Sequence, residues 1–65
     1  MKTVYLIDCS YDTARNADKE QLEKLFTIYN CDGGAFKYSI EEFEHAFNVG
    51  DISGEMLNDF MLRIV

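Results

Sequence analysis

The sequence predicts a small domain of the mixed α/β (α+β) class, built as a three-stranded sheet with two helices on one face. Three observations carry this prediction: an apolar run at Thr3–Cys9, two amphipathic segments that begin with capping residues, and a second apolar run at the end of the chain. In chain order they read strand, helix, strand, helix, strand. A length of 65 residues leaves room for a single domain, residues 1–65.

The first strand is predicted at Thr3–Cys9, in a run rich in Val, Tyr, Leu and Ile that ends at Asp8. A short apolar run without alternation is typical of a strand that is buried on both faces. The polar stretch 10–18 separates this strand from the next element.

The first helix is predicted at Asp18–Asn30. Asp18 is a suitable N-cap, and Gln21 three residues later completes a pair that resembles a capping box. The glycine-rich stretch 32–34 then breaks the helix. The apolar side chains that share one face at helical spacing are Leu22, Leu25, Phe26 and Tyr29.

A short second strand is predicted at Ala35–Tyr38, and the second helix begins at Ser39 and ends at Gly50. Ser39 and Glu42 have the spacing of a capping box. The helical period directs one set of side chains inward: Ile40, Phe43 and Phe47, with Ala46 beside them. It directs the opposite set to solvent: Glu41, Glu44, His45 and Asn48.

The last segment, Asp51–Val65, fits helical spacing along most of its length, but its final six residues, FMLRIV, fit a strand equally well. We favour a short turn or helix at Ser53–Asn58 followed by a strand. Such a strand would pair with Thr3–Cys9 and protect the edge of that strand.

The charge of the chain is unevenly distributed. Twelve acids against six bases give a net charge of −6, and from Tyr38 onward there are six acids and one base, Arg63. Such a surface repels phosphate backbones, so direct nucleic-acid binding is not expected. It favours instead a partner protein with a basic surface.

The apolar run at the N-terminus is too short to span a membrane, and no small-residue cleavage site follows it. We therefore expect a cytoplasmic protein without membrane contact. In that compartment Cys9 and Cys31 are expected to be reduced thiols in or near the core.

Catalysis is not expected, and no cofactor is implied. The chain has one histidine, His45, and no phosphate-binding glycine loop, which leaves little from which to build an active site. A calcium site is a minor alternative, because Asn30, Asp32 and Glu41 fall at positions 1, 3 and 12 of an EF-hand loop. Positions 5, 6 and 8 of that loop depart from the motif, so the preferred interpretation is a glycine turn between two helices.

The segment Tyr38–Phe47, YSIEEFEHAF, resembles part of the small uracil-DNA glycosylase inhibitors of Bacillus phages. Phe43, Glu44 and Phe47 match positions of the helix in that family, and Leu62-Arg63 matches its final strand. The resemblance implies that these helix residues help to form a dimer and engage the DNA-binding face of the enzyme. This chain carries an additional helix, Asp18–Asn30, where the family runs from strand to strand.

Nine aromatic rings are more than a core of this size can bury, and exposed rings beside acids are typical of a protein interface. The leading hypothesis is therefore a small acidic inhibitor, of the kind that phages carry, which blocks a nucleic-acid-handling enzyme through a DNA-mimicking face. A homodimeric structural or regulatory subunit is the alternative from another class. The candidate partner-binding residues are Glu41, Glu42 and Glu44 for charge and Phe43 or Phe47 for anchoring.

Overall fold

The computed structural model describes residues 2–65. Within them it places a three-stranded sheet and four helices, which confirms the predicted mixed α/β class. The elements follow one another as β1 (Thr3–Ile7), α1 (Tyr11–Ala14), α2 (Lys19–Asn30), β2 (Ala35–Ser39), α3 (Ile40–Asn48), α4 (Gly54–Asp59) and β3 (Met61–Ile64).

β1 is the central strand of the sheet, and both of its neighbours run antiparallel to it in the order β2-β1-β3. Leu6 lies opposite Phe36 of β2 and opposite Leu62 of β3. The prediction that the last residues form a strand beside β1 is confirmed. The short helix expected before it is confirmed as well, since Gly54–Asp59 is helical and the Ser53 side chain caps its N-terminus.

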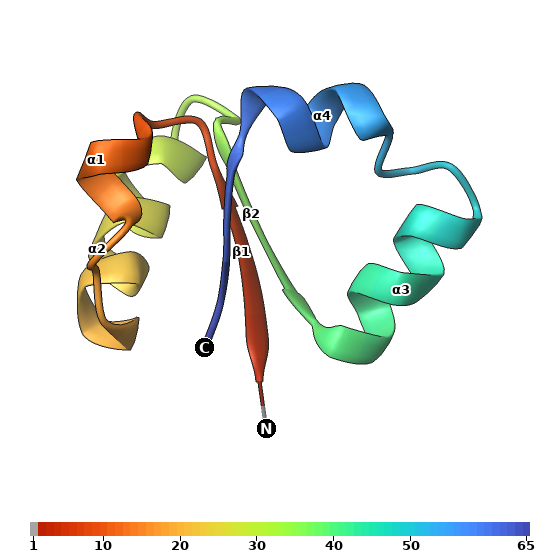
Figure 1. Ribbon diagram of the computed structural model, residues 1–65, viewed down its shortest axis with the longest axis horizontal. Coiled ribbons are helices and arrows are strands. Elements are labelled where there is room, and N and C mark those ends of the chain that lie inside the picture. The colour runs from red at the N-terminus through yellow and green to blue at the C-terminus, as the bar shows by residue number, and fades with distance from the viewer. Residues whose placement is uncertain (1) are drawn as a thin grey trace.

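The helices cover both faces of the sheet, so the prediction of two helices on one face is wrong. Figure 1 shows α1 and α2 on one side of the strands and α3 and α4 on the other. The reason lies in β1, whose side chains from Val4 to Ile7 are at most 1% exposed although they alternate between the two faces. A central strand that is apolar on both faces needs a helical layer on each.

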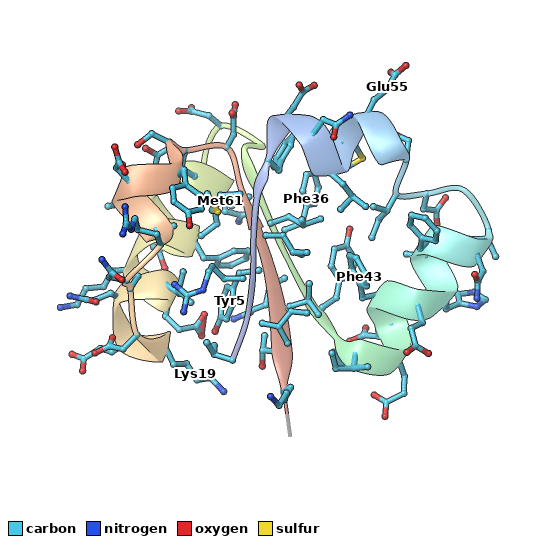
Figure 2. All side chains as sticks on the ribbon, viewed as in Figure 1. Tyr5, Lys19, Phe36, Phe43, Glu55 and Met61 are labelled. Atoms are coloured by element: carbon cyan, nitrogen blue, oxygen red, sulfur yellow. The ribbon has the colours of Figure 1, made fainter. Side chains whose placement is uncertain are left out.

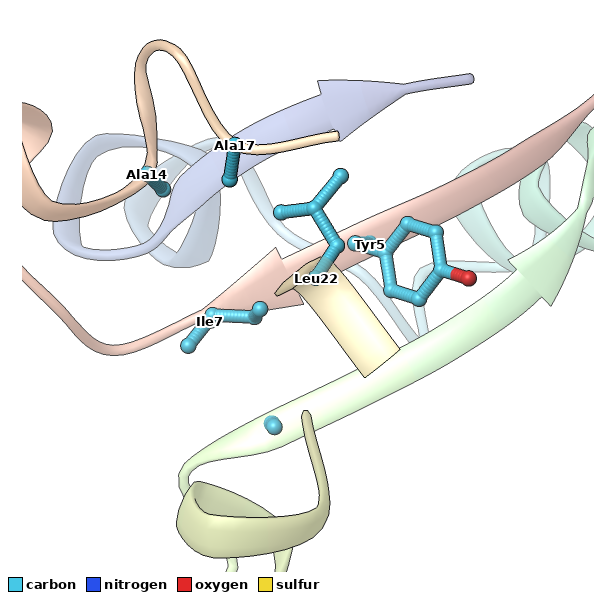
Figure 3. Close-up of a cluster of buried hydrophobic side chains, with 6 residues drawn as sticks. Tyr5, Ile7, Ala14, Ala17 and Leu22 are labelled. Atoms are coloured by element: carbon cyan, nitrogen blue, oxygen red, sulfur yellow. The ribbon is translucent and has the colours of Figure 1, made fainter. Parts of the chain in front are cut away.

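The first core cluster lies between the sheet and the α1–α2 layer. It joins Tyr5 and Ile7 of β1 with Leu22 of α2, as Figure 3 shows. The predicted stripe of α2 is confirmed there, because Leu22 is fully buried and the other three members pack partly buried against the cluster. The helix α1 was not predicted. It forms because the Ser10 side chain accepts a hydrogen bond from the Thr13 N–H, and it buries Ala14.

The second core cluster lies on the opposite face, between the sheet and the α3–α4 layer. Leu6, Ala46 and Ile52 are its buried members, and Phe36 and Phe43 are among the partly buried side chains packed against them. In Figure 2, Phe36 and Phe43 lie on this side of the strands, whereas Tyr5 and Met61 lie on the other.

The predicted helix boundaries are confirmed by their capping hydrogen bonds. Asp18 and Gln21 form a reciprocal capping box at the start of α2, and Ser39 and Glu42 form another at the start of α3. Gly50 has a φ of +87°, a backbone conformation that favours glycine, and it follows α3 where the helix was expected to end.

None of the helices within residues 2–65 is both long enough and apolar enough to cross a membrane.

Candidate functional site

Acidic side chains gather on the layer formed by α3 and α4. Residues 40–59 contain six acids and no lysine or arginine, so their charge of −6 equals the net charge of the whole chain. The other residues hold six acids and six bases, and their charges cancel. All six acids of the segment are exposed, and we call them the acidic layer: Glu41, Glu42, Glu44, Asp51, Glu55 and Asp59. Figure 2 shows Glu55 projecting from α4 away from the sheet.

The acids of this layer have no basic partner within the described part of the chain. The three ion pairs of residues 2–65, in contrast, all involve acids of α1 or α2: Arg15–Asp12, Lys24–Glu20 and Lys37–Glu23. The single base after residue 38, Arg63, sits opposite Tyr5 in the sheet and donates a hydrogen bond to the Ala14 carbonyl of α1. Its guanidinium is therefore held on the α1 side of the sheet, away from the acidic layer.

Stabilisation of the helices by negative charge explains the positions of only some of the acids in this layer. Glu41, Glu42 and Glu55 lie in first turns, where the helix dipole favours negative charge. The hydrogen bond from the Ser39 N–H to the Glu42 carboxylate lowers the pKa of Glu42, so this acid has a capping role in α3. Asp59 is the last residue of α4, where the dipole disfavours a negative charge, so its position calls for another explanation.

The Ser39 hydroxyl is expected to be the main local determinant of where α3 begins. It accepts a hydrogen bond from the Glu42 N–H at 3.1 Å. Replacing Ser39 by alanine should lower the free energy of unfolding by about 1 kcal/mol, measured by urea denaturation, because the amide loses its acceptor. Ser39→Thr keeps a hydroxyl at this position and should retain most of the stability. A Ser39→Ala protein as stable as the parent would contradict this role.

An aromatic cluster lies beneath the acidic layer. The rings of Tyr38 and Phe43 are 6.2 Å apart at 63°, and those of Phe36 and Phe60 are 5.8 Å apart. Burial, followed by the nearby Asp51 carboxylate, raises the pKa of Tyr38. Phe43 belongs to this cluster and is half-buried, so it supports α3 from below and is poorly placed to anchor a partner.

Phe47, the other candidate anchor, is exposed. The expectation that it completes the inward stripe of α3 is wrong: Phe47 is 48% exposed, and Ala46 is the buried residue at the end of the helix. The two positions differ by about 100° around the helix, and the rotation that buries Ala46 turns Phe47 toward solvent. Phe47 lies one turn after Glu44 on the helix surface, which places an exposed ring beside an exposed carboxylate.

The geometry of an EF-hand, the minor alternative raised by the sequence, is absent from residues 2–65. Residues 35–39, which would belong to the ligand loop, are the strand β2 paired with β1. Asn30 and Asp32 precede this strand and Glu41 follows it, so five extended residues, about 17 Å, separate the proposed ligands. Within residues 2–65 no three side chains of His, Cys, Asp or Glu lie together as a metal site.

Both cysteines are free thiols. Cys9 packs partly buried against the first core cluster, and burial raises the pKa of its thiol. Cys31, which was expected in or near the core, is exposed at the end of α2.

Sequence reasoning did not foresee a polar contact under α2. The Lys37 ammonium of β2 donates to both carboxylate oxygens of Glu23, at 3.0 and 3.1 Å. This interaction lowers the pKa of Glu23. The Tyr5 hydroxyl is fully buried and lacks a hydrogen bond of standard geometry, but the Glu23 carboxylate lies beside it. No local pattern links these residues, because their neighbourhood depends on the pairing of β1 with β2 and on the packing of α2.

No protein-family model, no curated protein and no solved structure matches this chain.

Proposed function

We propose that this protein acts by binding, without catalysis, and that it docks on the basic surface of another protein through its acidic layer. The observation that carries this proposal is the segregation of charge: residues 40–59 hold the entire net charge of −6, while the ion pairs lie elsewhere. Carboxylates without cationic partners, presented on one layer, raise the rate at which a basic surface is encountered. Phe47 supplies the apolar contact that affinity requires.

The partner class that fits this surface best is an enzyme that handles nucleic acid. Such an enzyme has a basic groove for phosphates, and rows of exposed carboxylates imitate those phosphates. The resemblance of Tyr38–Phe47 to uracil-DNA glycosylase inhibitors makes that enzyme the first one to test. We propose that the protein acts in the cytoplasm, and its two unbridged thiols support this.

The decisive experiment compares two variants with equal changes in net charge. Glu41→Lys with Glu44→Lys alters the acidic layer, and Glu20→Lys with Asp32→Lys alters exposed acids outside it. Each tagged protein is used to capture partners from a bacterial lysate at low and at high salt. We expect the association rate of the first variant with the captured target to be at least about tenfold lower than that of the parent. The second variant should bind as the parent does.

Two results would contradict the proposal. If both double variants weaken binding equally, net charge and not the acidic layer is responsible. If binding to the target does not weaken as salt rises, charge does not guide the association.

Inhibition of the enzyme is measured separately, by adding the protein to purified uracil-DNA glycosylase acting on uracil-containing DNA. We expect the protein to inhibit the enzyme and excess DNA to relieve the inhibition. The Phe47→Ala variant, which lacks the exposed ring, should inhibit less. Full activity at saturating protein would exclude this enzyme as the target.

A further inference from the structure

The two edges of the sheet differ in how they are protected. Along β2, the outer edge carries Lys37, which is ion-paired to Glu23, and the Ser39 N–H is bonded to the Glu42 carboxylate. A charged lysine and an occupied amide are features that discourage further strand pairing. The edge formed by β3 also carries one charged side chain, Arg63, but its guanidinium is bonded to a backbone carbonyl of α1, and no side chain of residues 2–65 occupies the outward amides of the strand.

The hydrogen-bonding pattern shows which peptide groups of β3 face outward. Thr3 and Val65 exchange both of their backbone hydrogen bonds, at 2.6 and 3.0 Å. Bonded and non-bonded pairs alternate along an antiparallel ladder, so Arg63 is bonded to β1 in the same way. The N–H and C=O groups of Leu62 and Ile64 therefore point away from β1. None of the other hydrogen bonds formed by residues 2–65 engages them.

The side chains at these two positions are apolar and exposed. Leu62 lies opposite Leu6 and Ile64 lies opposite Val4, so both project from the α3–α4 face of the sheet. Their partners on β1 are fully buried, whereas Leu62 is 39% and Ile64 is 44% exposed. The edge of β3 thus combines free backbone groups with an uncovered apolar strip, which is the combination that strand addition uses.

The absence of acids along this edge favours a second copy as the occupant. Residues 60–65 contain no acid and one base, so this edge is where two chains of net charge −6 can meet without opposing carboxylates. Suppose that the β3 strands of two copies pair antiparallel with Leu62 opposite Leu62. Arg63 of each copy then lies opposite Met61 of the other copy. This register avoids two facing arginines, which would destabilise the pair.

We propose that two copies of this chain associate by antiparallel pairing of their β3 edges, which joins the two sheets into one of six strands. The acidic layers of the two copies stay on the surface of the joined sheet. The pairing is independent of the proposed function, because it uses none of the acidic side chains.

Hydrogen exchange of the parent protein at rising concentration tests the pairing directly. The amides of Leu62 and Ile64 should exchange fast when the protein is dilute and become protected as it is concentrated. The Arg63 amide, bonded to β1, should be protected throughout and serves as an internal control.

Sedimentation equilibrium on three variants completes the test. Leu62→Lys places a charge on the strip, and Ile64→Pro removes an outward N–H without touching the ladder to β1. Each should raise the dissociation constant of the dimer at least about tenfold. Ile28→Lys, an equivalent change at a residue of α2 that is 64% exposed, should leave it unchanged.

A parent protein that stays monomeric up to millimolar concentration overturns the proposal and leaves the edge to a strand from a different protein. A dimer that neither Leu62→Lys nor Ile64→Pro weakens overturns it too, because the interface then lies elsewhere. If Leu62→Lys fails to fold, as judged by circular dichroism, Ile64→Pro and the exchange measurement decide.

Discussion

Replacing Leu6 by alanine is expected to destabilise the protein by about 2–5 kcal/mol, because the side chain is fully buried and its loss leaves a cavity. A domain of fewer than about 70–80 residues rarely has more than about 3–5 kcal/mol of stability. The variant should therefore be largely unfolded at room temperature. Since Leu6 packs against Ala46 of α3 and Ile52, the acidic layer would lose its support at the same time.

The matched control for this prediction is Leu62→Ala, the same substitution at the residue that lies opposite Leu6 in the sheet. Leu62 is 39% exposed, so this change should cost less than about 1 kcal/mol in dilute solution. Urea denaturation followed by circular dichroism measures both free energies of unfolding. Equal losses for the two variants would contradict the burial of Leu6 between the sheet and α3.

Alkaline pH is expected to destabilise the fold through Tyr5. Burial, and then the neighbouring Glu23 carboxylate, raise the pKa of Tyr5 from its ordinary value of 10.0 to about 12. The protonated hydroxyl is thus favoured in the folded state, and its contribution to stability is complete below pH 10. As pH rises from 10 through about 12, the unfolded chain releases this proton first and stability falls. The loss amounts to roughly 3 kcal/mol.

Tyr5→Phe isolates this effect, because phenylalanine fills the site but has no proton to release. The free energy of unfolding of Tyr5→Phe should fall less steeply between pH 10 and 12 than that of the parent. Tyr11→Phe, at a residue that is 64% exposed, is the control and should follow the parent curve. Part of the alkaline loss remains in Tyr5→Phe, since the pKa of Tyr38 is raised too. Identical curves for the parent and Tyr5→Phe would refute the assignment.

Local patterns predicted the elements well where a short-range interaction decides the structure. The capping boxes at Asp18 and Ser39 mark the starts of α2 and α3, and the hydrogen bonds that form them span three residues. The same kind of signal was present but overlooked at Ser10, which caps α1. The strand at Met61–Ile64 fitted two interpretations, and pairing with β1 decided between them.

The candidate site could be predicted only in part. The acids of α3 were expected on its outer face and are exposed, but the roles of the two phenylalanines depend on how the helix is rotated against the sheet. Phe43 packs on Tyr38 and Phe47 does not enter the core, a difference of orientation that helical periodicity alone leaves open. The contact of Tyr5, Glu23 and Lys37 joins three elements and has no local signature.

The mixed class, the helix boundaries and the excess of acids after residue 38 could be predicted from local patterns, because composition, capping and periodicity are properties of the chain and its near neighbours. The division of the helices between the two faces of the sheet, in contrast, depends on the folded arrangement. That division sets the acidic layer apart from the ion pairs around α2, and the strand order β2-β1-β3 places β3 at an edge of the sheet. The physical reason is that β1 buries apolar side chains on both faces, and covering both requires contacts between residues far apart in the chain.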